Sequence, residues 1–336
     1  MSTASAAIFT SIPAKVQRHD RRGVDIGQAY TERCVRSWLE GGHRVISVNT
    51  PAEIDQIASR FADVEFRAVE RSAVAAVGRP LVYMSDLLNE CAVAEADVVG
   101  IVNADLFLHA PKSFDRLLAR MDGRTLVYAE RLDVDDVDDP SEAEPYSAGM
   151  DCFLFSPSMV KEIGDENFIF GECWWDYWLP IVLAKRGHRL QLAGPPPFIK
   201  HLQHGDGGLG AHAGHYFDGF DSFVRALTVR LPLPGSDPWT IQANACFVGF
   251  LRLFNPASEP SERIIYVQFL GHVVRLYLHQ EPDLIAAIRQ MFADWRFNPA
   301  YPVEPRPILD RLYAAAEQAA GALAAAARSA AAGAPL

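Results

Sequence analysis

The stretch Val98-Val99-Gly100-Ile101-Val102-Asn103-Ala104-Asp105-Leu106-Phe107-Leu108 decides the fold that this sequence predicts. It is apolar almost throughout, and only Asn103 and Asp105 interrupt it. A continuous apolar run of this kind is typical of a strand in a parallel sheet with both faces covered. Ligands of open α/β sheets bind beyond the carboxyl ends of the strands. Asp105 is therefore a candidate site residue, with the cap of a turn or helix as the alternative.

The residues before this run alternate strands with helices. We expect strands at 7–11, 44–48 and 64–69, and helices at 30–40, 51–61 and 80–92. Gly41-Gly42 is a natural C-cap for the first helix, and Thr50 with Glu53 forms a capping-box pattern at the start of the second. Strands separated by helices of this length imply a mostly parallel, doubly wound sheet.

The second half of the chain changes character. Residues 130–144 are rich in acids and predict an exposed loop, 150–155 a strand with an inward acid, and 174–187 an aromatic-rich helix that ends at glycine. Amphipathic helices follow residue 214, and the end of the chain is dominated by alanine. We expect an α/β domain over 1–214, a helical region over 215–325 and a disordered tail over 326–336.

Composition restricts the classes of function. The net charge of −11 over 336 residues argues against a protein that binds nucleic acid by bulk electrostatics. The five cysteines are scattered and form no CxxC pair, which is typical of reduced thiols in the cytoplasm. No apolar run approaches the ~20 residues that span a bilayer. We expect a cytoplasmic protein without a transmembrane segment, whose membrane association, if any, is peripheral.

Four polar segments fall at the ends of predicted elements: Asn103-Ala104-Asp105, Gly149-Met150-Asp151, Trp174-Trp175-Asp176 and His201-Leu202-Gln203-His204. In this order and spacing they resemble a GT-A-fold glycosyltransferase with an Asn-Ala-Asp variant of the Asp-x-Asp motif. The resemblance covers roughly Ile8 to Asp206. It implies a Rossmann-like, doubly wound mixed sheet that binds a nucleotide-sugar donor, with the helical region appended.

The resemblance also implies roles for individual residues. Asp105 would hold a divalent cation, Mn²⁺ or Mg²⁺, completed by His204 or His201. Asn103, Gly149 and Asp151 would contact the donor. Other donor contacts would come from the first strand and the first helix, at Thr10, Ser11, Arg33 and Arg36, although either arginine could equally be a solvated helix charge. Because Asn103 replaces an aspartate, a metal-independent variant stays open.

An acceptor hydroxyl needs a base if the reaction inverts the anomeric carbon. The resemblance implies Asp176 for this role, with Glu172 as a second candidate. The helix dipole lowers the pKa of Asp176, whereas the neighbouring tryptophans raise it by desolvation, and the sequence leaves the balance open. Trp174, Trp175 and Trp178 would form a platform for the acceptor, or else a hydrophobic core.

The leading hypothesis is a metal-assisted glycosyltransferase that moves a sugar to a hydroxyl of a carbohydrate, lipid-linked or protein acceptor. Residues 205–214, rich in glycine, would close over the donor or link to the helices. The rivals are a non-catalytic scaffold or carbohydrate-binding protein and a nucleotidyltransferase. The latter is disfavoured because the loop after the first strand, 12–23, is poor in glycine. The C-terminal helices could serve a homo-oligomer.

Overall fold

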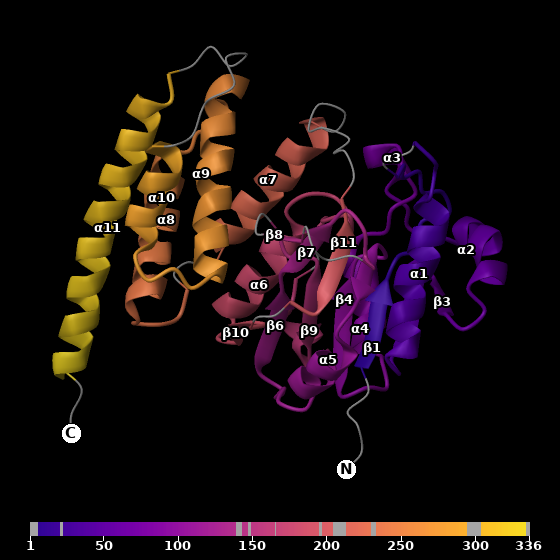
Figure 1. The fold of residues 1–336 in the computed structure, drawn as a ribbon. Helices are drawn as coiled ribbons and strands as arrows, with labels where there is room; N and C mark the ends of the chain where they lie inside the picture. The colour runs from indigo at the N-terminus through magenta and orange to yellow at the C-terminus, as the bar shows by residue number, and fades with distance from the viewer. Residues whose placement is uncertain are drawn as a thin grey trace. The chain divides into compact units, whose positions relative to one another are not determined.

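The computed structural model describes residues 6–20, 23–138, 143–146, 149–164, 166–194, 197–203, 213–229, 233–293 and 304–333. The chain forms two compact units. The first comprises Met1–Leu183 and His188–Ser222, and the second Ala184–Gly187 and Phe223–Leu336. Figure 1 shows the β-strands in the first unit and the helices α8 to α11 in the second.

The first unit is built on a seven-stranded sheet with the order β10-β6-β9-β4-β1-β2-β3. Its strands, in chain order, are β1 (Ala6–Thr10), β2 (Arg44–Asn49), β3 (Glu65–Ala68), β4 (Val98–Val102), β6 (Thr125–Ala129), β9 (Cys152–Phe155) and β10 (Arg189–Leu192). All neighbours are parallel except β9, which runs antiparallel between β4 and β6. The predicted doubly wound mixed sheet with a helical C-terminal region is confirmed.

A second, four-stranded sheet has the order β5-β11-β7-β8. Its strands are β5 (Leu106–Leu108), β7 (Arg131–Val134), β8 (Glu144–Tyr146) and β11 (Ile199–Leu202). Two expectations are corrected here. The run 98–108 is not one strand, because the chain turns at Asn103–Asp105 and its last residues enter the second sheet. The acidic segment is not only a loop, because β7 pairs with β11 and β8.

Helices cover both faces of the large sheet. In the first unit they are α1 (Gly27–Glu40), α2 (Pro51–Ile57), α3 (Val74–Val77), α4 (Met84–Ala92), α5 (Pro111–Leu118) and α6 (Trp175–Lys185), with the 3-10 turns η1 (Ala58–Arg60) and η3 (Pro157–Glu162). Ile8 of β1 shares a core with Trp38 of α1 and Phe114 of α5. Phe9 points to the opposite face and is equally buried. This double burial explains why the central strands read as continuous apolar runs.

The second unit is helical. It contains the end of α7 (Ala213–Val229), then α8 (Pro238–Leu253), α9 (Pro260–Leu278), α10 (Leu284–Ala293) and α11 (Arg306–Gly333). α8 approaches α11 closely at Gly249, where a Cβ would lie 2.8 Å from the backbone nitrogen of Ala316. The sequence predicts disorder from residue 326 onward, but α11 extends to Gly333. The reason is the run of alanines, the residue with the highest helix propensity. No described helix is long and apolar enough to cross a membrane.

Two glycines of the second unit give a matched test of this packing. Gly249→Ala would push a methyl group against the backbone of α11, so we expect a loss of about 1–3 kcal/mol in unfolding free energy. Gly321→Ala adds a methyl group where no atom lies within 4 Å, so we expect a gain of about 0.5–1 kcal/mol from helix propensity. Urea unfolding measures both. Equal effects of the two changes would contradict the contact between α8 and α11.

Candidate active site

Asp105 lies in the turn between β4 and β5, and two cationic side chains meet its carboxylate. Arg18 Nη2 donates to Asp105 Oδ2 at 2.8 Å, and His201 Nε2 of β11 lies 3.3 Å from the same oxygen. Burial alone would raise the pKa of Asp105, but the charges and hydrogen bonds of His201 and Arg18 outweigh it and hold the pKa well below its usual value. Asp105 is therefore an ionised, compensated carboxylate.

His201 is held between two carboxylates. Its Nδ1 lies 3.1 Å from Asp133 Oδ1 of β7, and its Nε2 faces Asp105. Burial lowers the pKa of His201, yet the two carboxylates reverse that effect and leave it raised. Both carboxylates have lowered pKa values, so the surroundings of His201 favour its protonated form.

Arg131 extends the same network to the start of β9. Its Nε donates to Asp133 Oδ1 at 2.8 Å, its Nη1 donates to Asp151 Oδ2, and its guanidinium lies 3.9 Å from the ring centroid of Tyr146. Asn103 Nδ2 donates to the other oxygen of Asp151 at 2.7 Å. A continuous polar network therefore connects the end of β4 with β7, β9 and β11.

Asp176, in the first turn of α6, lies next to this network. Its Oδ2 accepts from the backbone N–H of Met150 at 3.3 Å, and a Cβ on Gly149 would come within 2.7 Å of the same oxygen. Burial, and then the charge of Asp151, raise the pKa of Asp176 to about 7 against the opposing backbone N–H groups. Desolvation therefore outweighs the helix terminus, which resolves the balance that the sequence left open. The role of Gly149 is to leave room for this carboxylate.

Several predicted site residues have other partners. Arg33 pairs with Asp138 and stacks on Phe107, and Arg36 is exposed on α1. Neither contacts Asp105 or Asp151 in the described part of the chain. Glu172 pairs with Arg79 and is not in contact with Asp176 there. The structure therefore brings Asp105, Asp151, Asp176 and His201 to one edge of the sheet but not the two arginines.

The three tryptophans do not form an exposed acceptor platform. Trp174, Trp175 and Trp178 are each at most 3% exposed. Trp175 contacts Phe153 and Phe170, and Trp178 stacks on Phe168 at 4.9 Å. Burial of these large rings stabilises the packing of α6 on the sheet more than an exposed position would. The prediction of an acceptor platform is wrong, and the alternative interpretation as hydrophobic core holds.

The ends of β1 and β2 carry hydroxyl and amide groups. Asn49 Nδ2 donates to Ser11 Oγ at 3.2 Å and to the carbonyl of Ile12 at 3.0 Å. Thr10 Oγ1 is buried and has no hydrogen-bond partner among the residues that the structure describes. Thr10 and Ser11 thus lie at the carboxyl end of the central strand, as predicted. Their contact with a donor stays a prediction.

The residues expected to bind a divalent cation do not fit one as they are arranged. His201 directs both of its ring nitrogens at carboxylates, Nδ1 at Asp133 and Nε2 at Asp105. Arg18 already supplies positive charge at Asp105. Among the described residues, no group of three His, Cys, Asp or Glu side chains is placed to hold a metal. His204 and residues 205–212 lie outside the described ranges.

Sequence reasoning missed Arg18 and Arg131. Arg18 belongs to the basic segment after β1, and nothing in the sequence around it indicates that its side chain reaches Asp105. Arg131 is the single arginine in the acidic segment 130–144, and that isolation was the available signal.

Comparisons with known proteins find weak structural likenesses and no family. No protein-family model matches the chain, and no curated protein matches it in sequence. Solved structures that resemble it include Staphylococcus aureus TarS with UDP-GlcNAc (10% identity, 90% of this chain and 95% of that one, TM-score 0.49). The Pyrobaculum calidifontis mannosyltransferase PcManGT with GDP-Man and Mn²⁺ has 13% identity, covers 95% and 86%, and has a TM-score of 0.42.

A nucleotidyl transferase from Methanothermobacter thermautotroptrophicus also resembles the chain, at 17% identity over 67% of this chain and 99% of that one, with a TM-score of 0.35. The similar structures are thus transferases of two chemical kinds. At these scores the likenesses carry no argument about the chemistry of this chain.

Arg131 gives a direct test of the network. Arg131→Met would leave Asp133 and Asp151 without their shared cation, and we expect a loss of about 3 kcal/mol in unfolding free energy at pH 7. Arg131 helps to lower the pKa of Asp133, so its stabilisation is present above the unfolded pKa and disappears as the pH falls. The difference between variant and wild type should therefore persist down to about pH 4 and shrink as the pH falls further, through the lowered pKa of Asp133.

The control is Arg189→Met, which removes an ion pair with Asp122 at an exposed position. Such pairs contribute about 0–1 kcal/mol, so this variant should unfold nearly as the wild type does. If Arg131→Met behaved like Arg189→Met at pH 7, the network would not hold the two sheets as described.

Proposed function

We propose that the chain is a glycosyltransferase that uses a nucleotide-sugar donor and inverts the anomeric carbon. The observation that carries the proposal is the carboxyl of Asp176, whose pKa is raised to about 7 beside Asp151 at the edge of the sheet where parallel strands end. A general base works best when its pKa lies near the working pH. Ordinary surface carboxylates have pKa values near 4, well below a neutral working pH.

In the proposed reaction Asp176 accepts the proton of an acceptor hydroxyl. The hydroxyl oxygen forms a bond to the anomeric carbon, and the bond from that carbon to the diphosphate oxygen breaks. The nucleoside diphosphate leaves with the electron pair. Asn103 and Asp151, joined by their hydrogen bond, are proposed to orient sugar hydroxyls, and Thr10 and Ser11 to contact the nucleoside.

The growing charge on the diphosphate requires nearby positive charge. Arg18, His201 and Arg131 are each paired with a carboxylate of Asp105, Asp133 or Asp151, so the proposal assigns none of them to this charge. No step of the proposal is routed through a divalent cation.

The nucleotidyltransferase alternative is disfavoured by the loop after β1. This loop, residues 12–23, contains one glycine, and its Arg18 is 6% exposed and directed at Asp105. It is therefore not a glycine-rich cradle for a triphosphate. The scaffold alternative is disfavoured by Asp176, because an ionised carboxylate with a raised pKa lowers stability at neutral pH and a protein without catalysis gains nothing from it.

Asp176 and Glu172 give the direct test of the proposed base. Purified protein is incubated with UDP-, GDP-, CMP- and ADP-linked sugars, and the released nucleotide is measured. We expect slow release from one donor class, a reduction of about 10²–10⁴ in Asp176→Asn, and less than tenfold in Glu172→Gln, since Glu172 is engaged with Arg79. The wild-type rate should rise as the pH increases through about 7, where Asp176 loses its proton.

Each part of this experiment has a result that would contradict the proposal. Pyrophosphate release from a nucleoside triphosphate with a sugar phosphate would support nucleotidyl transfer instead. An unchanged rate in Asp176→Asn would remove Asp176 from the reaction, and no turnover of any donor would favour the scaffold.

A further inference from the structure

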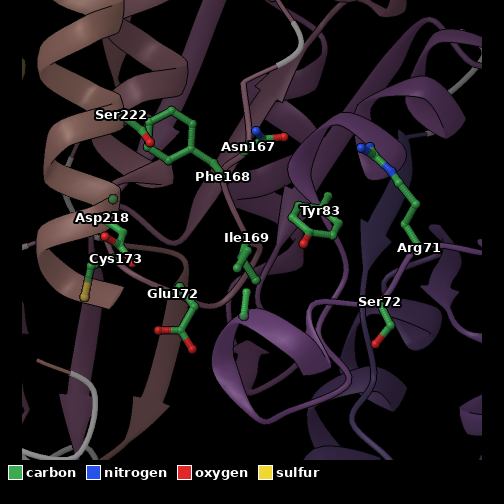
Figure 2. A pocket seen from close by; sticks show the side chains of 12 residues that line it. Arg71, Ser72, Tyr83, Asn167, Phe168, Ile169, Glu172, Cys173, Asp218 and Ser222 are labelled. Atoms are coloured by element: carbon green, nitrogen blue, oxygen red, sulfur yellow. The ribbon is translucent and has the colours of Figure 1, made fainter. Parts of the chain in front are cut away.

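A cavity of about 490 Å³ lies within the first unit, beside the segment that leads into α6. Figure 2 shows its walls: Asp218 and Ser222 from α7 on one side, Tyr83 and Arg71 on the other, and Asn167, Phe168 and Ile169 between them. Its volume lies in the range of small-molecule sites, ~300–1,000 Å³. Glu172 and Cys173 line it a few residues before Asp176 in the chain.

The walls of the cavity are fixed by backbone contacts. Met84 N donates to the carbonyl of Phe168 at 2.8 Å, and Phe170 N donates to the carbonyl of Val82 at 2.9 Å. On the other side α7 comes close at Gly219, where a Cβ would lie 3.0 Å from the carbonyl oxygen of Cys173. These contacts hold the backbone of the walls in place, which lowers the entropic cost of binding a ligand.

The lining combines apolar surfaces with hydroxyl, amide and carboxylate groups. Ile169 and Ala76 supply apolar surface, and Asn167, Ser72 and Ser222 supply hydrogen-bonding groups. A sugar ring has the same two characters, apolar C–H faces and a rim of hydroxyls. The lining therefore suits a saccharide better than a purely apolar ligand.

The charges at the cavity disfavour an anion. Arg71 is paired with Asp86 through three hydrogen bonds of 2.8–3.1 Å, and Arg79 is paired with Glu172. Asp218 adds a further carboxylate to the lining. A phosphate or carboxylate ligand would meet Glu172 and Asp218 while both arginines are already compensated.

The cavity lies next to the proposed base along the chain. Glu172 and Cys173 line the cavity, and they precede Asp176, which stands in the first turn of α6, by four and three residues.

We infer that this cavity binds a neutral, hydroxyl-rich saccharide, and that it is the acceptor site of the proposed reaction. The assignment of this cavity as the acceptor site rests on the proposed function. The binding of a saccharide to the cavity can be tested independently of that function. It also replaces the tryptophan platform, whose rings are buried.

Ala76 and Ala75 provide a matched pair of variants on α3. Both are exposed, but only Ala76 is in the lining. Ala76→Trp should fill the cavity, whereas Ala75→Trp places the same ring outside it. Binding is measured on an array of immobilised neutral oligosaccharides and their phosphorylated counterparts. We expect wild type and Ala75→Trp to bind at least one neutral glycan, and Ala76→Trp to bind it at least tenfold more weakly.

Cys173 offers a second readout. All five cysteines lie within the described residues, and only Cys173 is exposed. The glycan identified on the array should slow alkylation of Cys173 at pH 9 in wild type and not in Ala76→Trp. Unslowed alkylation in wild type would contradict binding in this cavity.

Donor hydrolysis without acceptor separates the two proposals, and it should be equal in wild type and both tryptophan variants. If donor is hydrolysed but Ala76→Trp binds glycans as wild type does, the acceptor site is wrong and the proposed function stands. If Ala76→Trp loses glycan binding but no donor is hydrolysed, the proposed function is wrong and the saccharide site stands. Binding of phosphorylated glycans alone, or of no glycan, would overturn the inference.

Discussion

The candidate site depends on the pairing of Arg131 with Asp133 and Asp151. Arg131 and Asp133 belong to β7 of the small sheet, whereas Asp151 precedes β9 of the large sheet, so this one guanidinium joins the two sheets. Side chains this little exposed cannot leave charge uncompensated without a cost of several kcal/mol. His201 and Arg18 continue the same compensation to Asp105. Neighbouring cations therefore fix the positions of these acids.

The carboxyl of Asp176, unlike those of Asp105, Asp133 and Asp151, is not paired with a cationic side chain of the described residues, so burial raises its pKa. No arginine, lysine or histidine of the described residues pairs with its carboxyl, which accepts backbone hydrogen bonds and lies near the negative charge of Asp151. Two acids in one partly buried region cannot both ionise at their usual pH. The network thus keeps Asp105 ionised and leaves Asp176 as the group that exchanges a proton near neutrality.

The sequence predicts the frame of this site better than its contacts. Apolar runs such as Val98–Val102 predict the central strands because both faces are buried, and Asp105 and Asp176 were recognisable where polar residues interrupt such runs. Arg131 could not be recognised in this way. It lies in β7, a strand of four residues inside an acidic segment, which has too few apolar positions to show alternation. Trp178 was recognised as a candidate but assigned the wrong role. The sequence pattern of aromatic residues near the start of a helix is the same whether they face a ligand or the core, and Trp178 is buried in the core.

The central claim is that Asp176 is a proton acceptor tuned to neutral pH, and a carboxyl titration tests it most directly. Protein labelled with ¹³C at the aspartate carboxyl carbons is titrated from pH 4 to 9, and the spectrum of Asp176→Asn assigns the resonance. The account predicts one carboxyl with a midpoint of about 7 that disappears in the variant. A resonance of Asp176 that titrates below pH 5, like an ordinary surface aspartate, would contradict it.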